Sequence, residues 1–457
     1  MSEKLRSVGL DVGTTTTQLI VSELTVQNRA SGFAVPEMEI TDRTILYRSP
    51  VHFTPLLDES HVDGEAIRKI VAAEYEKAGI DRESIDTGAI IITGETSRKE
   101  NARAVLEAVS AFAGDFVVAT AGPDLESVLA AKGAGAVDFS ERTGKTVLHM
   151  DIGGGTSNLA LMENGKIVGT GCLNVGGRLL KFDTQGTITY VSPVLQGLTH
   201  LKTGHRPTAV QLEEVAQILV QALEMAAGLR EKTELLDRLT TDEAAGASPI
   251  PSGKAVISFS GGVADCIESS HSPHSFGDMG PVLGQAIRKS RLCQGEFMLG
   301  TETIRATVIG AGCHSAQLSG STVFYRGVAL PLKNLPVAVL DAKEQEDPER
   351  ITQRMAAQDA ETVVLAMPGY SAPSYDRVTA LAEAIIQGTK GRPIYVCLEA
   401  DMAKALGHSL CLRLPAHTPC LCIDRVRLTQ ESYLDIGAPV GPALPVVIKT
   451  LVLPKRV

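Results

Sequence analysis

The chain has 457 residues, of which 44% are hydrophobic, so it is long enough to bury sizeable cores in about two to four domains. Its net charge of −10 and pI of about 5.6 argue against nucleic acid or an anionic membrane as the main partner, because both bind basic surfaces. The eight scattered cysteines form no CxxC pair, which predicts reduced thiols and argues against an iron–sulfur protein.

The N-terminal region predicts a strand, a turn and a returning strand. Asp11 ends an apolar run that begins at Val8, and Gly13 with the hydroxyl residues Thr14, Thr15 and Thr16 forms the turn. No secretory leader pattern precedes this run, and the sequence has no stretch of about 18 uninterrupted apolar residues, so we expect a cytoplasmic protein.

The next elements are predicted from local signals. Residues 63–79 predict a helix that begins after Asp63 and ends at Gly79, and residues 89–93 predict a buried strand. The polar loop that follows carries Glu95 and Arg98, which we interpret as a solvated helix start. Residues 121–136 predict a helix whose many small residues allow another backbone to pack very closely.

A second hairpin of the same kind is predicted at residues 147–162. Asp151 ends its first strand, three glycines form the turn, and hydroxyl residues follow. Its turn residues are Gly153, Gly154, Gly155, Thr156 and Ser157. Backbone N–H groups of such a turn can approach a phosphate, and an aspartate beside that anion is expected where a hard cation lies between them. One glycine-rich hairpin alone does not distinguish a phosphate site from an ordinary β-hairpin. Two copies about 140 residues apart indicate two similar half-domains facing one nucleotide.

The remaining chain predicts a third glycine turn and a further domain. An apolar strand at residues 255–260 breaks into Gly261 and Gly262 before a helix start, and a glycine-rich helix that contains Gly310 and Gly312 follows near residues 307–316. Beyond it, apolar strands alternate with helical patterns, which predicts an α/β layout. There, Cys420 and Cys422 are expected to lie on the two faces of one strand.

In this order, the motifs resemble the two phosphate motifs, the adenosine motif and the connecting helices of the actin, sugar-kinase and Hsp70 ATPase superfamily. Several longer segments resemble the ethanolamine ammonia-lyase reactivating factors over nearly the whole chain: residues 8–18, 90–95, 151–158, 172–180, 306–312 and 330–338.

The resemblance implies an α/β fold: a duplicated actin-like (ribonuclease H-like) ATPase core with lobes at residues 1–132 and 133–319, and an appended α/β domain at residues 320–457. It also implies ATP and Mg²⁺ as cofactors. Asp11 and Asp151 would hold the metal and act in catalysis, while Asp124 or Glu126 would position the attacking water. The glycine turns, their hydroxyl residues, Gly310 and Gly312 would bind the nucleotide.

The function that the resemblance implies is an ATP-dependent chaperone that helps ethanolamine ammonia-lyase exchange damaged cobalamin for adenosylcobalamin. Two other classes stay open: an actin-fold small-molecule kinase and a nucleotide-binding module without hydrolysis. The sequence leaves open the oligomeric state, including a homo-oligomer, and enclosure in a bacterial microcompartment.

Overall fold

The structure is a computed structural model of the whole chain. It describes residues 2–13, 16–28, 38–58, 61–81, 84–93, 101, 109, 117–120, 123–241, 251, 254–269, 271–314, 316–320, 322–358, 360–426, 428, 432–439 and 443–450. The predicted site residues Thr14 and Thr15 lie outside the described residues, as do Glu95 and Arg98.

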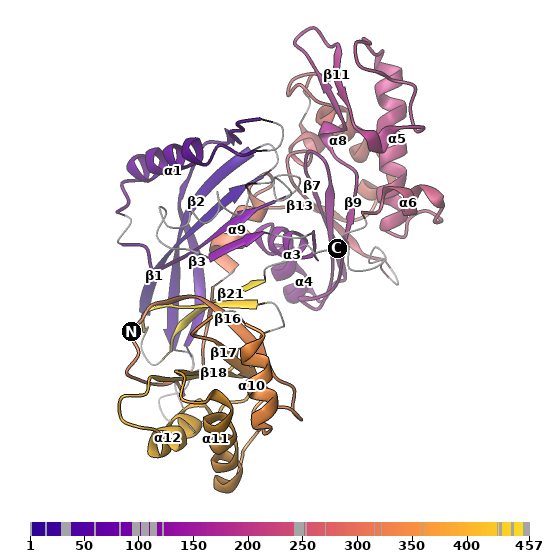
Figure 1. Cartoon of the computed structure of the whole chain (residues 1–457). Coiled ribbons are helices and arrows are strands. Elements are labelled where there is room, and N and C mark those ends of the chain that lie inside the picture. Colours follow the sequence, from indigo (N-terminus) through magenta and orange to yellow (C-terminus); the bar gives the residue numbers. More distant parts are fainter. Residues whose placement is uncertain are drawn as a thin grey trace.

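The first lobe is a mixed sheet built on the N-terminal hairpin (Figure 1). Its elements are β1 Ser2–Val12, β2 Thr16–Asn28, β3 Met38–Arg48, β4 His52–Phe53, α1 Gly64–Ala78, β5 Thr87–Ile92 and β6 Val117–Thr120. Strands β1, β2 and β3 are antiparallel neighbours, while β5 and β6 add parallel strands on the other side of β1. Alternate residues of β1, such as Val8 and Leu10, share a core with Ile67 and Val71 of α1.

The second lobe repeats this sheet. Its elements are α3 Pro123–Gly133, α4 Ala136–Thr143, β7 Val147–Ile152, β8 Ser157–Glu163, β9 Lys166–Leu173, η3 Gly177–Leu179, β10 Leu180–Phe182, β11 Ile188–Val191, η4 Pro193–Leu195, α5 Ala209–Ala226, α6 Glu234–Leu239, β12 Val256–Ser260, α7 Asp265–Glu268, α8 Gly280–Lys289, η5 Arg291–Cys293, β13 Phe297–Leu299 and α9 Ala306–His314. Strands β7, β8 and β9 are antiparallel, and β12 and β13 continue parallel to β7. Because both sheets have this order, the predicted duplicated actin-like architecture is confirmed.

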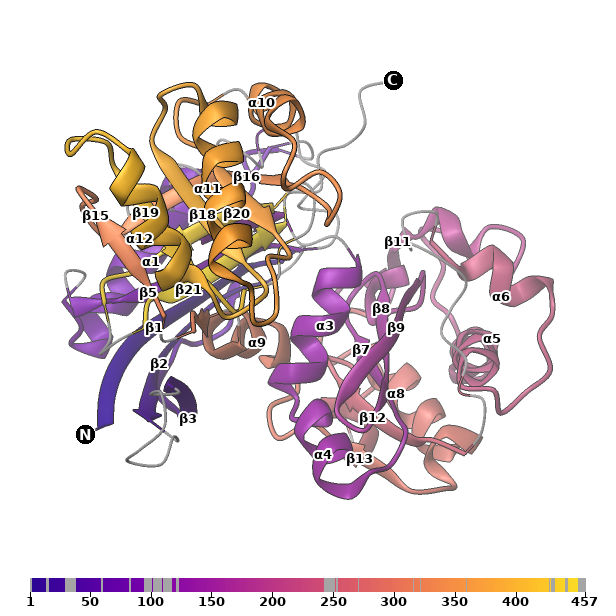
Figure 2. The same cartoon turned by 90° about the horizontal axis from the view of Figure 1, so that it is seen from below.

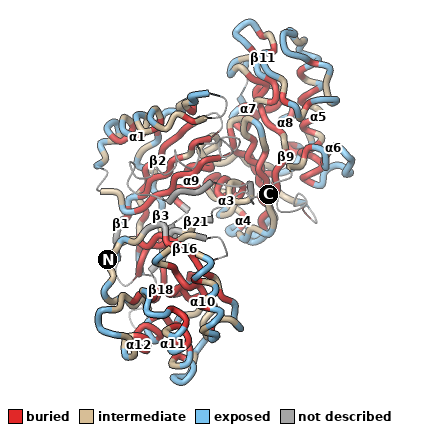
Figure 3. The backbone as a smooth tube through the Cα atoms, viewed as in Figure 1, coloured by how far each residue is buried: buried red, intermediate tan, exposed pale blue. Residues whose placement is uncertain are grey.

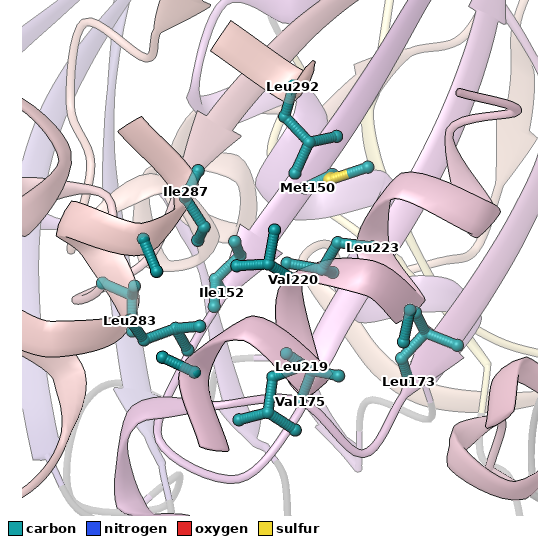
Figure 4. Packing of buried hydrophobic residues seen from close by; sticks show 14 of the residues in the cluster. Met150, Ile152, Leu173, Val175, Leu219, Val220, Leu223, Leu283, Ile287 and Leu292 are labelled. Atoms are coloured by element: carbon teal, nitrogen blue, oxygen red, sulfur yellow. The ribbon is translucent and has the colours of Figure 1, made fainter. Parts of the chain in front are cut away.

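The largest core lies between this second sheet and helices α5 and α8 (Figure 4). Met150 and Ile152 of β7 pack there with Leu219 and Leu223 of α5 and with Leu283 of α8. Burying each such side chain stabilises the fold by about 1.5–3 kcal/mol. The opposite face of β7 carries His149 and Asp151, so packing of the apolar face directs these two side chains toward the connecting helices.

Helices α3 and α9 connect the lobes and cross at glycines. A Cβ atom added to Gly133 of α3 would collide with the carbonyl of Ala306, and one added to Gly310 of α9 would collide with the carbonyl of Leu129. A Cβ on Gly312 would lie 3.0 Å from the backbone nitrogen of Gly9 on β1. The small residues therefore allow the backbones to touch, as the sequence predicts for both helices.

The C-terminal domain is an eight-stranded sheet with its helices on one face. Its elements are β14 Ala316–Leu318, β15 Phe324–Arg326, β16 Leu332–Val339, α10 Pro348–Ala356, β17 Val364–Met367, α11 Tyr375–Thr389, β18 Ile394–Leu398, α12 Ala403–Arg413, β19 Cys420–Ile423, β20 Ser432–Ile436 and β21 Pro445–Thr450. Strands β16 to β19 are parallel neighbours in chain order, and the helices that connect them, α10, α11 and α12, pack into one core on the same side of the sheet. Figure 3 shows the buried strands at the centre of this domain and of each lobe.

Two details of this domain differ from what the sequence suggests. Cys420 and Cys422 both lie in the core beneath the helices, so their predicted placement on two faces is wrong, because residues i and i+2 of a strand share a face. Strand β14, which precedes the predicted boundary at residue 319, pairs with β21 near the C-terminus. Figures 1 and 2 show the domain beside the first lobe, where β14 and β21 approach β3 and β6.

Candidate nucleotide and cation site

The two glycine hairpins have the same local geometry. The N–H of Gly13 donates to the carbonyl of Thr16 at 2.9 Å, and the N–H of Gly153 donates to the carbonyl of Thr156 at the same distance. Asp151 lies at the end of β7, as Asp11 does at the end of β1. Each hairpin therefore presents a tight turn next to a strand-end carboxylate, as predicted.

The two carboxylates lie close enough to interact. Burial raises the pKa of Asp11 to about 7; the hydrogen bond from Thr93 at 2.9 Å opposes this rise, and the charge of Asp151 adds to it. Burial raises the pKa of Asp151 to about 6, against the hydrogen bonds from Ser260 and Thr307. Ionising two buried, neighbouring carboxyl groups is unfavourable in free energy, and a cation bound between them would offset that free energy.

A buried polar chain fixes the orientation of Asp151. Ser260 donates its hydroxyl proton to Asp151, so its oxygen can accept the Nε2 proton of His149, which lies 2.9 Å away. The Ser258 hydroxyl then donates to Nδ1 of His149 at 3.0 Å. Burial lowers the pKa of His149 to about 3, so the ring is neutral at physiological pH. It links the hydroxyl groups of Ser258 and Ser260 by hydrogen bonds.

The second hairpin is braced from behind by the segment that begins η3. The N–H groups of Gly177 and Arg178 donate to the carbonyls of Gly153 and Gly154 at 3.0 and 2.6 Å. The side chain of Arg178 passes over Gly154, where an added Cβ would lie 3.1 Å from its Cδ, and its Nε donates to Asp278 at 3.2 Å. This ion pair holds a cationic side chain against the predicted phosphate turn.

The third glycine turn joins the same edge of the second sheet. Gly261 has φ +85°, and a Cβ there would collide with the carbonyl of Ile152, so the fold itself requires this glycine. Gly262 differs, because a Cβ atom on it would have only the Ile304 side chain within 4 Å, at 3.9 Å. The space beside Gly262 is therefore open, as the predicted adenosine motif requires.

Other predicted residues are placed by packing. Asp124, in the first turn of α3, accepts a hydrogen bond from Thr170 on β9 at 2.5 Å, and β9 is separated from β7 by β8. Gly310 and Gly312 face the backbones of α3 and β1, so helix packing accounts for both. Their predicted parts in water positioning and nucleotide binding stay predictions, as does that of Glu126.

Sequence reasoning missed several residues that complete the site. Thr93, Ser260, Thr307 and His149 are polar residues within or just after apolar segments, and each contacts a predicted carboxylate or its partner. The available signal was the polar residue at the end of a buried strand: Thr93 follows β5, which pairs with β1, and Ser260 ends β12, which pairs with β7.

The carboxylate oxygens of Asp11 and Asp151 would suit a hard cation whose other ligands are waters and phosphate oxygens of a nucleotide. Within the described residues, no group of three or more His, Cys, Asp or Glu side chains could enclose a metal ion. Two carboxylates beside a predicted phosphate turn would suit Mg²⁺, which keeps several waters and commonly binds through one or two carboxylates plus phosphate oxygens. Asp11 and Asp151 are the residues that would hold it.

A hollow of about 900 Å³ lies elsewhere on the second lobe, between the 198–201 segment and α5. It is lined by none of the predicted site residues.

No helix within the described ranges is both long and apolar enough to cross a bilayer.

The comparison with protein families gives a match to almost the whole chain. The model described as "Ethanolamine utilisation protein EutA" covers residues 3–454. The chain belongs to the EutA family. Its relatives include proteins named "Ethanolamine ammonia-lyase reactivase EutA" from Salmonella typhimurium and Escherichia coli, each 39% identical and aligned over 99% of both chains.

Solved structures similar to this EutA family member are more distant. A Ppx/GppA family protein from Aquifex aeolicus is 12% identical, covers 67% of this chain and 97% of its own, and has a TM-score of 0.41. The ethanolamine utilization protein EutJ from Carboxydothermus hydrogenoformans is 18% identical, covers 67% of this chain and 88% of its own, and has a TM-score of 0.33. At these values neither comparison carries a functional argument.

Proposed function

We propose that this chain is an ATP-dependent reactivating chaperone of ethanolamine ammonia-lyase, acting in the cytoplasm, inside or outside a microcompartment. It would promote release of damaged cobalamin so that adenosylcobalamin can bind. The observation that carries the proposal is the 39% identity, over the full length, to two proteins named as reactivases of this lyase. The paired hairpins support the dependence on ATP.

The site suggests how nucleotide would act on the lobes. Bound Mg²⁺-ATP would supply a transferable phosphoryl group and the positive charge that the two carboxylates need. Asp11 and Gly13 belong to the first lobe, whereas Asp151 and the 153–155 turn belong to the second. A ligand held by both hairpins would fix the angle between the lobes, and that angle would set the affinity for the lyase.

The decisive experiment is reactivation of the lyase in vitro. Lyase inactivated with a cobalamin that lacks the adenosyl group is incubated with this protein, ATP, Mg²⁺ and adenosylcobalamin, and ammonia production is followed. We expect recovery only when all four additions are present. Asp11→Ala and Asp151→Ala should each abolish reactivation and ATP hydrolysis, whereas Asp376→Asn, on the exposed start of α11, should leave both intact.

Two outcomes would replace the proposal. ADP formation in proportion to an added metabolite, without lyase recovery, would identify a small-molecule kinase. ATP binding with background turnover in the presence of the lyase, again without recovery, would identify a nucleotide-binding module.

A further inference from the structure

Two buried amide side chains occupy equivalent positions beside the two carboxylates. Gln18 of β2 pairs directly with Asp11, and Asn158 of β8 pairs directly with Asp151. Residues that pair in this way project from the same face of a sheet, so each amide lies on the carboxylate's side of its lobe. Gln18 is 3% exposed and Asn158 is 2% exposed.

Both amides have an oxygen without a hydrogen-bond partner. Oε1 of Gln18 and Oδ1 of Asn158 are buried and accept no hydrogen bond. The orientation of Gln18 is set by its Nε2, which donates to the carbonyl of Ile304 at 3.1 Å and so leaves the oxygen as the unsatisfied atom. A buried acceptor without a donor destabilises a fold, and native proteins rarely keep one without a reason.

A packing role does not account for this arrangement. At Asn158 an apolar residue of the same shape would fill the position without leaving an acceptor unsatisfied, whereas at Gln18 it would also remove the donor to the Ile304 carbonyl. The same feature occurs twice, in two lobes, each time directly opposite the carboxylate that ends the preceding strand. The structure therefore places two free acceptors next to the two residues that a cation would require.

We propose that Gln18 and Asn158 are positioning residues whose amide oxygens accept hydrogen bonds from the water ligands of the cation at Asp11 and Asp151. This inference rests on the proposed nucleotide site. Mg²⁺ gives up its waters reluctantly, so a site with two carboxylates needs acceptors that orient the remaining waters. An amide provides such an acceptor without adding a third negative charge to a pair that already repels.

The inference is tested with side chains that keep the shape but remove the acceptor. The variants are Asn158→Leu and Gln18→Met, and Asn158→Asp restores an oxygen at that position. Gln345→Met is the matched control, because Gln345 is a 1% exposed glutamine whose Oε1 already accepts the N–H of Gly369 at 3.0 Å.

Two measurements separate cation positioning from packing. Binding of Mn²⁺ by each protein with saturating ADP is followed by electron paramagnetic resonance, and the thermal midpoint is measured in EDTA. We expect Asn158→Leu and Gln18→Met to weaken Mn²⁺ binding at least tenfold. Asn158→Asp should bind Mn²⁺ more tightly than Asn158→Leu, because it again carries an acceptor oxygen at that position. In EDTA, Asn158→Leu should not lower the midpoint, because it removes an unsatisfied acceptor, whereas Gln345→Met should lower it.

Each outcome decides the matter. If Asn158→Leu and Gln18→Met bind Mn²⁺ like the wild type, the inference is wrong while the nucleotide site stands. If Asn158→Leu lowers the midpoint in EDTA as Gln345→Met does, its amide is structural. Should Asn158→Leu fail to fold, both measurements on Gln18→Met decide. Weakened Mn²⁺ binding with a midpoint in EDTA no lower than that of Gln345→Met supports the inference, and a lower midpoint shows that the bond from Gln18 to the Ile304 carbonyl is structural. If the wild type binds no Mn²⁺ with ADP, the proposed site and this inference both fail.

Discussion

Binding of Mg²⁺-nucleotide should weaken steeply below neutral pH. The perturbation is a change from pH 8 to pH 6, and its targets are Asp11 and Asp151, whose pKa values are raised by burial to about 7 and about 6. A cation between the two side chains requires both in the ionised form, so protons compete with it.

The size of the effect follows from these two values. Both carboxylates are ionised in about 90% of molecules at pH 8 and in about 5% at pH 6, so the apparent affinity should fall about 20-fold. Asp11→Asn should bind more weakly at both pH values because it lacks one of the two charges, and its further fall between pH 8 and pH 6 should be only about twofold because only Asp151 still titrates. Nucleotide protonation is common to both proteins and cancels in the comparison.

The assay is isothermal titration calorimetry with Mg²⁺ and a non-hydrolysable ATP analogue at several pH values. A wild-type affinity that falls no more than that of Asp11→Asn would refute the reasoning.

The ligand-free protein offers a second test, in which stability falls as the pH rises. Because the folded-state pKa of Asp11 lies above its unfolded value of 3.8, the stability linked to this group is complete below pH 3.8 and is lost as the pH rises toward 7. Asp11→Asn should remove this loss.

Three further predictions concern the glycine turns and the C-terminal domain. Gly155→Ala should weaken ATP binding at least tenfold, because the added methyl group would occupy the phosphate space. It should not change the thermal midpoint, because its Cβ meets no protein atom within 4 Å. Gly295→Ala, at an equally open position, is the control and should bind ATP normally. Gly262→Val should reduce nucleotide affinity with little loss of stability, checked by calorimetry and thermal unfolding, and normal affinity would disprove the adenosine assignment. A chain that ends at His314, before β14, should retain ATP binding and lose lyase reactivation; reactivation by this truncated protein would show that the C-terminal domain is not needed.

Local chemistry made much of the fold predictable. Asp63 caps α1 by accepting the N–H of Ala66, and Gly79 ends it with φ 63°, because these positions need an acceptor and a left-handed residue. The hairpins were predictable for the same reason. Each is specified within about ten residues, and its duplication supplied the evidence that a single copy lacks.

Long-range contacts could not be predicted in this way. The hydrogen bond between Ser260 and Asp151 and the pairing of β14 with β21 join residues more than 100 positions apart. Nothing in the local pattern of either partner specifies the other. The burial that raises the pKa of Asp11 likewise depends on the whole lobe.

The position of α9 has a consequence for synthesis of the chain. This helix covers the face of the first sheet that contains Ile20, and the carbonyl of Gly312 accepts a hydrogen bond from Ser7, which is 305 positions earlier. A ribosome that adds about 5–20 residues per second therefore leaves that face uncovered for roughly 15–60 s. During this interval the emerging first lobe presents buried-type apolar residues to its surroundings, so holding by a general chaperone should raise the yield of native protein most while residues 130–310 are being made.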